Sequence, residues 1–96
     1  MHCNKIIFSG HAVQRMFERG IKEPEAAKVI TDGEVIAEYP DDRPFPSVLI
    51  LGFTDGRACH IVAGIDREKH FCYVITVYFP DSALWTSDYK KKRKPL

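Results

Sequence analysis

The sequence has no apolar run of the roughly 18 residues that a membrane-spanning helix needs. Its start, Met1–Lys5, is followed by only three apolar residues, Ile6 to Phe8. That run is too short for the hydrophobic core of a secretory signal peptide. We therefore expect a soluble protein located in the cytoplasm.

Cysteine is scarce, with only Cys3, Cys59 and Cys72 in 96 residues. An odd number of cysteines without close spacing does not resemble a disulfide framework. A Cys-x-x-Cys pair, the usual mark of a structural zinc site, is also missing. We expect reduced thiols that are mostly buried, because cysteine behaves as a small apolar residue.

The strong catalytic motifs are missing as well. The sequence contains no P-loop, no GxGxxG, no HExxH and no GxSxG pattern, which argues against the enzyme classes that these motifs define. No metal or cofactor is expected. Any chemistry must come from single residues that the fold brings together.

The charge is divided unevenly along the chain. The 14 basic and 13 acidic residues nearly balance, but five basic residues form the run Lys90–Lys94 and all acidic residues precede it. The 9 basic and 13 acidic residues before this run give the body a net charge of −4. We expect one domain over residues 1–88 and a basic tail over residues 89–96. The tail either contacts nucleic-acid phosphates through Lys90, Lys91, Lys92 and Arg93 or is a solvated, frayed terminus.

Two short helices are predicted in the first third of the chain. Ser9 is a good N-cap for a helix over residues 11–18, and Gly20 suits its C-terminal cap. A second helix over residues 23–32 has Pro24 in its first turn and ends at Gly33. In the first helix, residues four apart form an apolar stripe of Ala12, Val13, Met16 and Phe17.

Strands follow the helices. Alternation with a period of two predicts strands over residues 34–39, 47–54, 57–65 and 71–79, and residues 5–8 form a short edge strand. Asp55–Gly56 predicts a type I′ hairpin, whereas three prolines make residues 40–46 a loop. Helices followed by strands indicate an α+β fold, with two helices packed on one face of a four-stranded antiparallel meander sheet.

The last strand has one fully apolar side and one mixed side. The apolar side is expected to face the helices, and the mixed side can then be exposed to solvent. A shift of one residue in the register would reverse this assignment. The apolar side comprises Phe71, Tyr73, Ile75, Val77 and Phe79, and the mixed side Cys72, Val74, Thr76 and Tyr78.

The first candidate site is one flank of the first helix. His11, Arg15 and Arg19 recur every four residues and so lie along one side. The planar guanidinium group suits a phosphate, and histidine is the usual proton carrier near neutral pH. The alternative is a solvated flank on which Arg15 pairs with Glu18.

A second candidate is His60, which lies inside an apolar strand and needs a hydrogen-bond partner or an open face. It is either a core histidine whose ring nitrogens are hydrogen bonded, or a member of an exposed group with Thr76 and Tyr78. A histidine and a tyrosine on one open sheet face can move a proton at a phosphodiester. We expect His60 to lie on the mixed face.

Two further features are ambiguous. Arg43, in the proline-rich loop, either contacts a substrate or neutralises its acidic neighbours Asp41 and Asp42. Trp85 and Tyr89, just before the basic run, either stack on bases or pin the C-terminal segment onto the domain.

Over roughly residues 5–88 the chain resembles a small bacterial family of uncharacterised domains. The opening signature is Ser-x-His-Ala followed by Arg-x-x-x-Arg-Gly-Ile. The matching blocks are Phe8–Ala12, Arg15–Met16, Glu18–Ile21, Gly33–Ile36, Tyr39–Pro44, His60–Val62, Val74–Tyr78, Pro80 and Trp85. Two features depart from the resemblance: Lys22 replaces a better N-cap residue, and the body is acidic.

The family in turn resembles the RelE-like toxins of toxin–antitoxin systems. This resemblance implies two helices packed on an antiparallel sheet, metal-free cleavage of messenger RNA by the ribose 2′-OH, and a small zinc-ribbon antitoxin as partner. His11, Arg15, Arg19 and His60 match the family pattern without assigned roles. By their chemistry, His11 or His60 can act as the general acid or base, and Arg15 or Arg19 can bind the phosphate. Tyr78 can orient the histidine. The alternative function is a non-catalytic binding or regulatory domain, and a third reading is a structural domain without a site.

Overall fold

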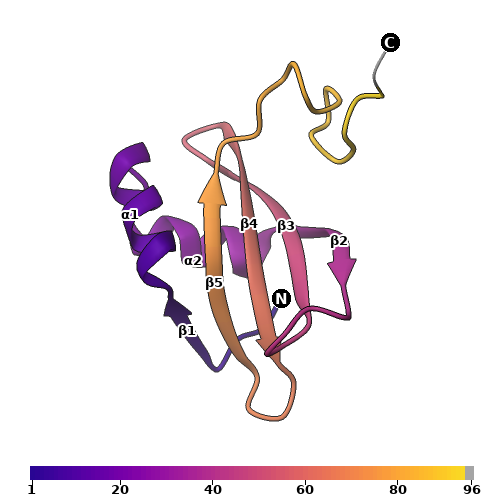
Figure 1. The fold of residues 1–96 in the computed structure, drawn as a ribbon. Coiled ribbons are helices and arrows are strands. Elements are labelled where there is room, and N and C mark those ends of the chain that lie inside the picture. Colours follow the sequence, from indigo (N-terminus) through magenta and orange to yellow (C-terminus); the bar gives the residue numbers. More distant parts are fainter. Residues whose placement is uncertain (95–96) are drawn as a thin grey trace.

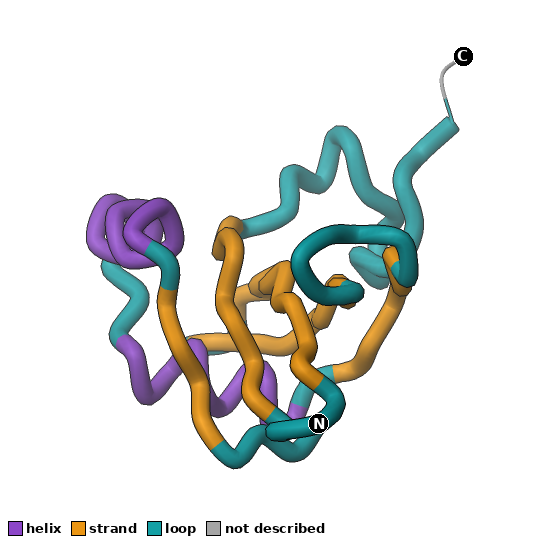
Figure 2. The backbone as a smooth tube through the Cα atoms, turned by 60° about the horizontal axis from the view of Figure 1, so that its bottom comes forward, coloured by secondary structure: helices purple, strands orange, loops and turns teal. Residues whose placement is uncertain are grey.

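The computed structural model describes residues 1–94 and has an α+β architecture (Figure 1). In Figure 2 both helices lie to one side of the strands, and the chain after the last strand leaves on the other. No helix among the described residues is long and apolar enough to cross a membrane. In chain order the elements are β1 (Lys5–Phe8), α1 (Gly10–Arg19), α2 (Glu23–Asp32), β2 (Glu34–Tyr39), β3 (Ser47–Thr54), β4 (Arg57–Asp66) and β5 (Phe71–Tyr78).

The helix ends follow local signals in the sequence. The Ser9 hydroxyl accepts a hydrogen bond from the Ala12 N–H at 3.0 Å and so caps α1. Gly20 ends α1 in the left-handed conformation, with φ 68°. At the start of α2, Lys22 has no capping side chain, and its backbone N–H donates instead to the Glu25 carboxylate at 3.0 Å. The departure at Lys22 is therefore compensated within the first turn.

The sheet contains five strands in the order β1-β5-β4-β3-β2. Strands β2 to β5 form the predicted antiparallel meander, and the Asp55–Gly56 hairpin has the positive φ angles (52° and 74°) that a type I′ turn requires. The prediction of a purely antiparallel four-stranded sheet is wrong in one respect. Strand β1 pairs with β5 in parallel, from Lys5 with Phe71 to Phe8 with Val74. The short apolar run Ile6–Phe8 thereby joins the sheet and makes it mixed.

A β-bulge alters the predicted faces of β5. Val62 pairs with Thr76 but Ala63 pairs with Val74, so Ile75 is an extra residue without a partner. Before the bulge the alternation is reversed: Val74 is fully buried, whereas Ile75 is 43% exposed. The assignment of Val77 to the core is confirmed, while the placement of residues 71–75 is wrong because the bulge shifts their register. We call the sheet side away from α2 the outer face; its paired positions on β4 and β5 are His60, Val62, Gly64, Tyr73, Thr76 and Tyr78.

The core lies between the sheet and the two helices. Helix α2 packs across β3 and β4, whereas α1 contacts β5 at the edge of the sheet (Figure 1). Because α1 sits at this edge, only one row of its predicted apolar stripe is buried. Ala12 and Met16 are in the core, but Val13 and Phe17 are 48% and 87% exposed.

The expectation of three reduced thiols is wrong for two of them. Cys3 and Cys72 form a disulfide, with their Cα atoms 5.8 Å apart. Cys72 pairs with Ile6 of β1, and Cys3 lies two residues before that strand, so the parallel pairing brings the two cysteines close although 69 positions separate them in the sequence. Cys59 is a buried free thiol, and burial raises its pKa to about 11.

Candidate active site on the outer face of the sheet

Four polar side chains, in two hydrogen-bonded pairs, lie in a row on the outer face. His60 pairs with Tyr78 and Val62 with Thr76, so Thr76 and Tyr78 point to the side of the sheet that His60 occupies. This confirms that His60 joins the mixed face. The imidazole of His11 reaches this row from α1, with Nε2 hydrogen bonded to Thr76 Oγ1 at 3.2 Å. We call His11, Thr76, Tyr78 and His60 the outer-face row.

Helix α1 holds His11 in place through its own cap. The Ser9 backbone N–H donates to the Val74 carbonyl at 3.0 Å, and its hydroxyl donates to the Ile75 carbonyl at 3.1 Å. These two bonds fix the start of α1 against the bulged part of β5. His11, two residues later, is exposed to solvent at the edge of the outer face.

His60 is fully buried and both ring nitrogens are hydrogen bonded. Nε2 lies 2.9 Å from the Tyr89 carbonyl oxygen, and Nδ1 lies 3.1 Å from the Tyr78 hydroxyl. Because a carbonyl only accepts, Nε2 carries the proton and Nδ1 accepts from the tyrosine. Burial lowers the pKa of His60 and raises the pKa of Tyr78. The pair is therefore a neutral imidazole beside a protonated phenol.

The C-terminal segment, residues 80–94, covers this end of the outer face. Trp85 is 9% exposed and packs edge-on against the His60 ring at a centroid distance of 4.5 Å. Lys90 forms an ion pair with Glu34 at the start of β2, at 3.1 Å. The mixed face is consequently closed over His60, and Trp85 pins the segment onto the domain.

The basic run adopts local structure as far as Lys94. A β-bridge joins Lys92 to Trp85, the Lys91 N–H donates to Thr86 Oγ1 at 3.3 Å, and the Arg93 side chain donates to the Ser82 carbonyl at 3.0 Å. Within the described residues, the tail is therefore a folded turn and not a frayed end. Lys91, Lys92, Arg93 and Lys94 line a shallow basic hollow on it.

The two arginines of α1 are bound to a helix neighbour. Arg15 donates to the Glu18 carboxylate at 2.9 Å, and the Arg19 guanidinium lies 3.8 Å from it. The hydrogen bond from Arg15 is the main cause of the lowered pKa of Glu18. The structure thus brings His11, Tyr78 and His60 into one row and leaves Arg15 and Arg19 paired on the solvated flank.

Arg43 lies at the other end of the outer face. Its guanidinium donates to the backbone carbonyls of Asp41 and Asp42, at 3.2 and 3.3 Å. Beside it Phe45 stacks on Tyr73, with ring centroids 5.1 Å apart and planes within 2° of parallel. This aromatic pair is not predicted from the sequence, because the alternation along the last strand places Tyr73 on the side that faces the helices.

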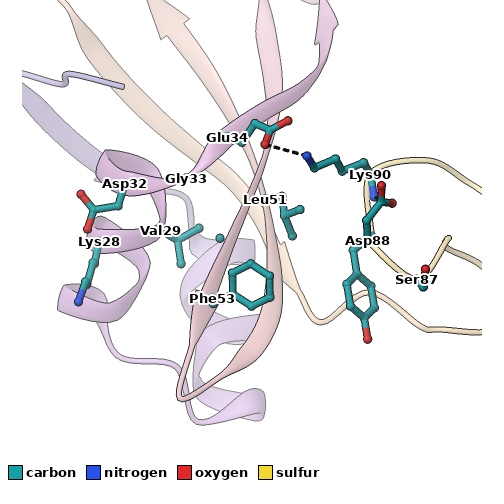
Figure 3. Close-up of a pocket in the computed structure, with 12 residues that line it drawn as sticks. Lys28, Val29, Asp32, Gly33, Glu34, Leu51, Phe53, Ser87, Asp88 and Lys90 are labelled. Carbon is teal, nitrogen blue, oxygen red and sulfur yellow. Dashed lines mark hydrogen bonds and ion pairs between the residues drawn. The ribbon is translucent and has the colours of Figure 1, made fainter.

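A separate hollow of about 630 Å³ lies at the edge of β3 (Figure 3). It lies between the end of α2, the start of β2 and the C-terminal segment, and the Lys90–Glu34 ion pair crosses it. Its lining combines Lys28 and Lys90 with Asp32, Glu34 and Asp88 and includes no histidine. Its lining thus mixes both signs of charge, whereas the histidines singled out from the sequence lie on the outer face.

The described residues contain no group of three histidine, cysteine or acidic side chains arranged to hold a metal ion. Their buried side-chain nitrogen and oxygen atoms all have hydrogen-bond partners. In the outer-face row His11 is bonded to Thr76, and His60 is bonded to Tyr78 and to the Tyr89 carbonyl.

The buried neutral imidazole predicts a pH-dependent stability. Unfolded His60 takes up a proton near its ordinary pKa of about 6.5, whereas the folded state resists protonation because the pKa is lowered. The stabilisation is complete above about pH 6.5 and is lost as the pH falls toward the folded pKa. Between about pH 7 and pH 5, His60 should lower the free energy of unfolding by at most about 2 kcal/mol. Urea denaturation of wild type and His60→Gln should show a smaller decrease in the variant; equal decreases would contradict this role.

The protein is a small α+β domain whose outer sheet face carries the row of His11, Thr76, Tyr78 and His60. Residues 8–79, or 72 of the 96, match the model of a family described as a domain of unknown function (DUF4258). The chain belongs to that family. No curated protein and no solved structure matches it.

Proposed function

We propose that the protein is a toxin-type, metal-independent endoribonuclease, as in the RelE-like toxins, restrained by a zinc-ribbon antitoxin. The observation that carries this proposal is the outer-face row. It presents an exposed imidazole, His11, and a phenol backed by a buried imidazole, Tyr78 with His60. Thr76 and Tyr78 are two residues apart on β5, or about 7 Å along the strand. The His11 imidazole, which is bonded to Thr76, and the Tyr78 phenol can thus both reach one phosphodiester.

The row supports a balanced cleavage step. The ribose 2′-oxygen attacks the adjacent phosphorus while the bond from phosphorus to the 5′-oxygen breaks, leaving a cyclic phosphate. The 2′-OH proton passes to the Tyr78 oxygen as the phenolic proton passes to His60 Nδ1, and the Tyr89 carbonyl supports the resulting imidazolium. The His11 imidazole donates the proton that the leaving 5′-oxygen takes up. In this scheme His60 never touches RNA and acts as a positioning residue for Tyr78.

Basic side chains next to the row can hold the phosphate. Arg15 lies one helical turn after His11 on the same flank, and its ion pair with Glu18 is weak because both side chains are exposed to water. Exchanging that carboxylate for a phosphate is therefore easy. Arg19 is held more loosely by the same carboxylate. Arg43 at one end of the face, and Lys91, Lys92 and Arg93 of the C-terminal segment, offset the acidic body.

A second candidate is a non-catalytic binding or regulatory domain. One observation favours it: both nitrogens of His60 are already bonded within the protein, and the C-terminal segment seals that end of the face. In this case the row is structural, and the exposed part of the outer face binds a partner.

Induced expression in a bacterial host separates the two candidates. Wild-type protein should arrest growth and degrade messenger RNA, and His11→Ala should relieve the arrest at equal protein level, because it removes the proton donor. Arg15→Ala should weaken the effect by removing a phosphate contact. Arg67→Ala, at an exposed arginine in the β4–β5 turn, is the matched control and should remain toxic.

Normal growth with abundant soluble wild-type protein would reject the ribonuclease and leave the binding domain. Co-expression of a small Cys-x-x-Cys protein encoded beside this chain tests the proposed partner. It should restore growth to cells that express the wild-type protein.

A further inference from the structure

A small aromatic pocket lies at the end of the outer face farthest from the C-terminal segment. Its volume is about 290 Å³, near the lower end of the range for small-molecule sites, about 300–1,000 Å³. The 40–46 loop and the bulged part of β5 form it together. It is lined by the stacked Phe45 and Tyr73, by Ile75 and Pro44, and by Arg43 and Asp42 at its mouth, with Gly64 at its base.

The pocket depends on two local features of the sheet. The bulge turns Tyr73 and Ile75 outward, so that an aromatic ring and an aliphatic chain line one side. Gly64 keeps the base free of side-chain atoms. A Cβ added there would meet Phe45 at 3.8 Å and Ile75 at 3.9 Å, so a larger side chain would occupy the hollow.

The charges at the mouth favour an anion on one side. Arg43 uses one guanidinium nitrogen for two backbone carbonyls, and its other donors remain for a ligand. Asp42 keeps its negative charge, and its carboxylate accepts a hydrogen bond from the Ser47 hydroxyl, so only the Arg43 side of the mouth suits an anion. A planar apolar ring in the pocket would thus place a linked phosphate beside Arg43.

We infer that this pocket is a nucleobase subsite for single-stranded RNA, an inference that rests on the proposed ribonuclease function. Aromatic rings next to a basic group are how proteins hold single strands, with the base stacked and the backbone on the cation. Tyr73 and Thr76 pair with Gly64 and Val62, which are two residues apart, or about 7 Å along β4. A short strand with one base against Phe45 and Tyr73 can therefore place a neighbouring phosphate at the outer-face row.

Binding of a fluorescently labelled 2′-O-methyl oligoribonucleotide tests the subsite, because that strand cannot be cleaved. Phe45→Leu keeps an apolar side chain but removes the ring, and it should weaken binding about 5- to 150-fold, the usual range for one lost base stack. Gly64→Val, which fills the base of the pocket without changing either ring, should weaken binding similarly. Phe17→Leu changes an 87% exposed ring on α1 and should bind like wild type. Thermal unfolding of each variant establishes that it is folded.

The outcomes separate the subsite from the ribonuclease. Active wild type with unchanged binding in folded Phe45→Leu and Gly64→Val overturns the subsite and leaves the ribonuclease standing. Binding that depends on Phe45 without any cleavage of natural RNA rejects the ribonuclease and retains the subsite. Failure of wild type to bind the oligonucleotide, or binding of a proline-rich peptide in its place, also overturns the subsite.

Discussion

Tyr78→Phe is expected to slow RNA cleavage by about 10²- to 10⁴-fold, the usual contribution of one acid–base group. The substitution removes the hydroxyl that is hydrogen bonded to His60 Nδ1 at 3.1 Å and keeps the ring that packs edge-on against the imidazole. It leaves Nδ1 without a partner and should lower the free energy of unfolding by about 1–3 kcal/mol. Single-turnover cleavage of a labelled RNA by purified protein measures the first effect, and urea denaturation measures the second.

Tyr39→Phe is the matched control for this experiment. Tyr39 is a partly exposed tyrosine at the end of β2 that, after burial, is a smaller cause of the raised pKa of Tyr78, and no hydrogen bond joins its hydroxyl to His60. Its variant should cleave RNA at the wild-type rate. If Tyr78→Phe cleaved equally fast, the proton would not pass through this phenol, and His11 with a different base would have to carry the reaction.

Loss of the Cys3–Cys72 disulfide is expected to lower the free energy of unfolding by about 4 kcal/mol. The bond closes a loop with a sequence separation of 69, and a loop of this size strongly restricts the unfolded chain. The change is a large part of the roughly 5–15 kcal/mol that stabilises a typical domain. Urea denaturation with and without a reductant measures it.

A variant with Cys3→Ser and Cys72→Ser serves as the control. It should match the reduced wild type and show no further response to reductant, since the remaining cysteine, Cys59, is buried and its pKa is raised to about 11. Identical denaturation midpoints for oxidised and reduced wild type would show that the bond does not constrain the unfolded chain.

The sequence by itself determined the features that depend on neighbouring residues. Ser9 and Gly20 set the ends of α1, and the Asp55–Gly56 turn set the β3–β4 hairpin. These signals act through bonds and dihedral angles within a few residues, so they need no knowledge of the fold. Strand alternation likewise placed His60 and Tyr78 on one face, because their hairpin register is not disturbed until after Val62.

Only the tertiary structure decided the features that join distant parts of the chain. The parallel pairing of β1 with β5, and with it the Cys3–Cys72 disulfide, brings together opposite ends of the domain. The bulge at Ile75 turned Tyr73 outward to meet Phe45. Docking of the C-terminal segment placed the Tyr89 carbonyl on His60 and closed the face above it. The alternation of side chains along a strand has a period of two, so it carries no information about an inserted residue or a docked segment. For that reason the sequence identified the residues of the row but not their surroundings.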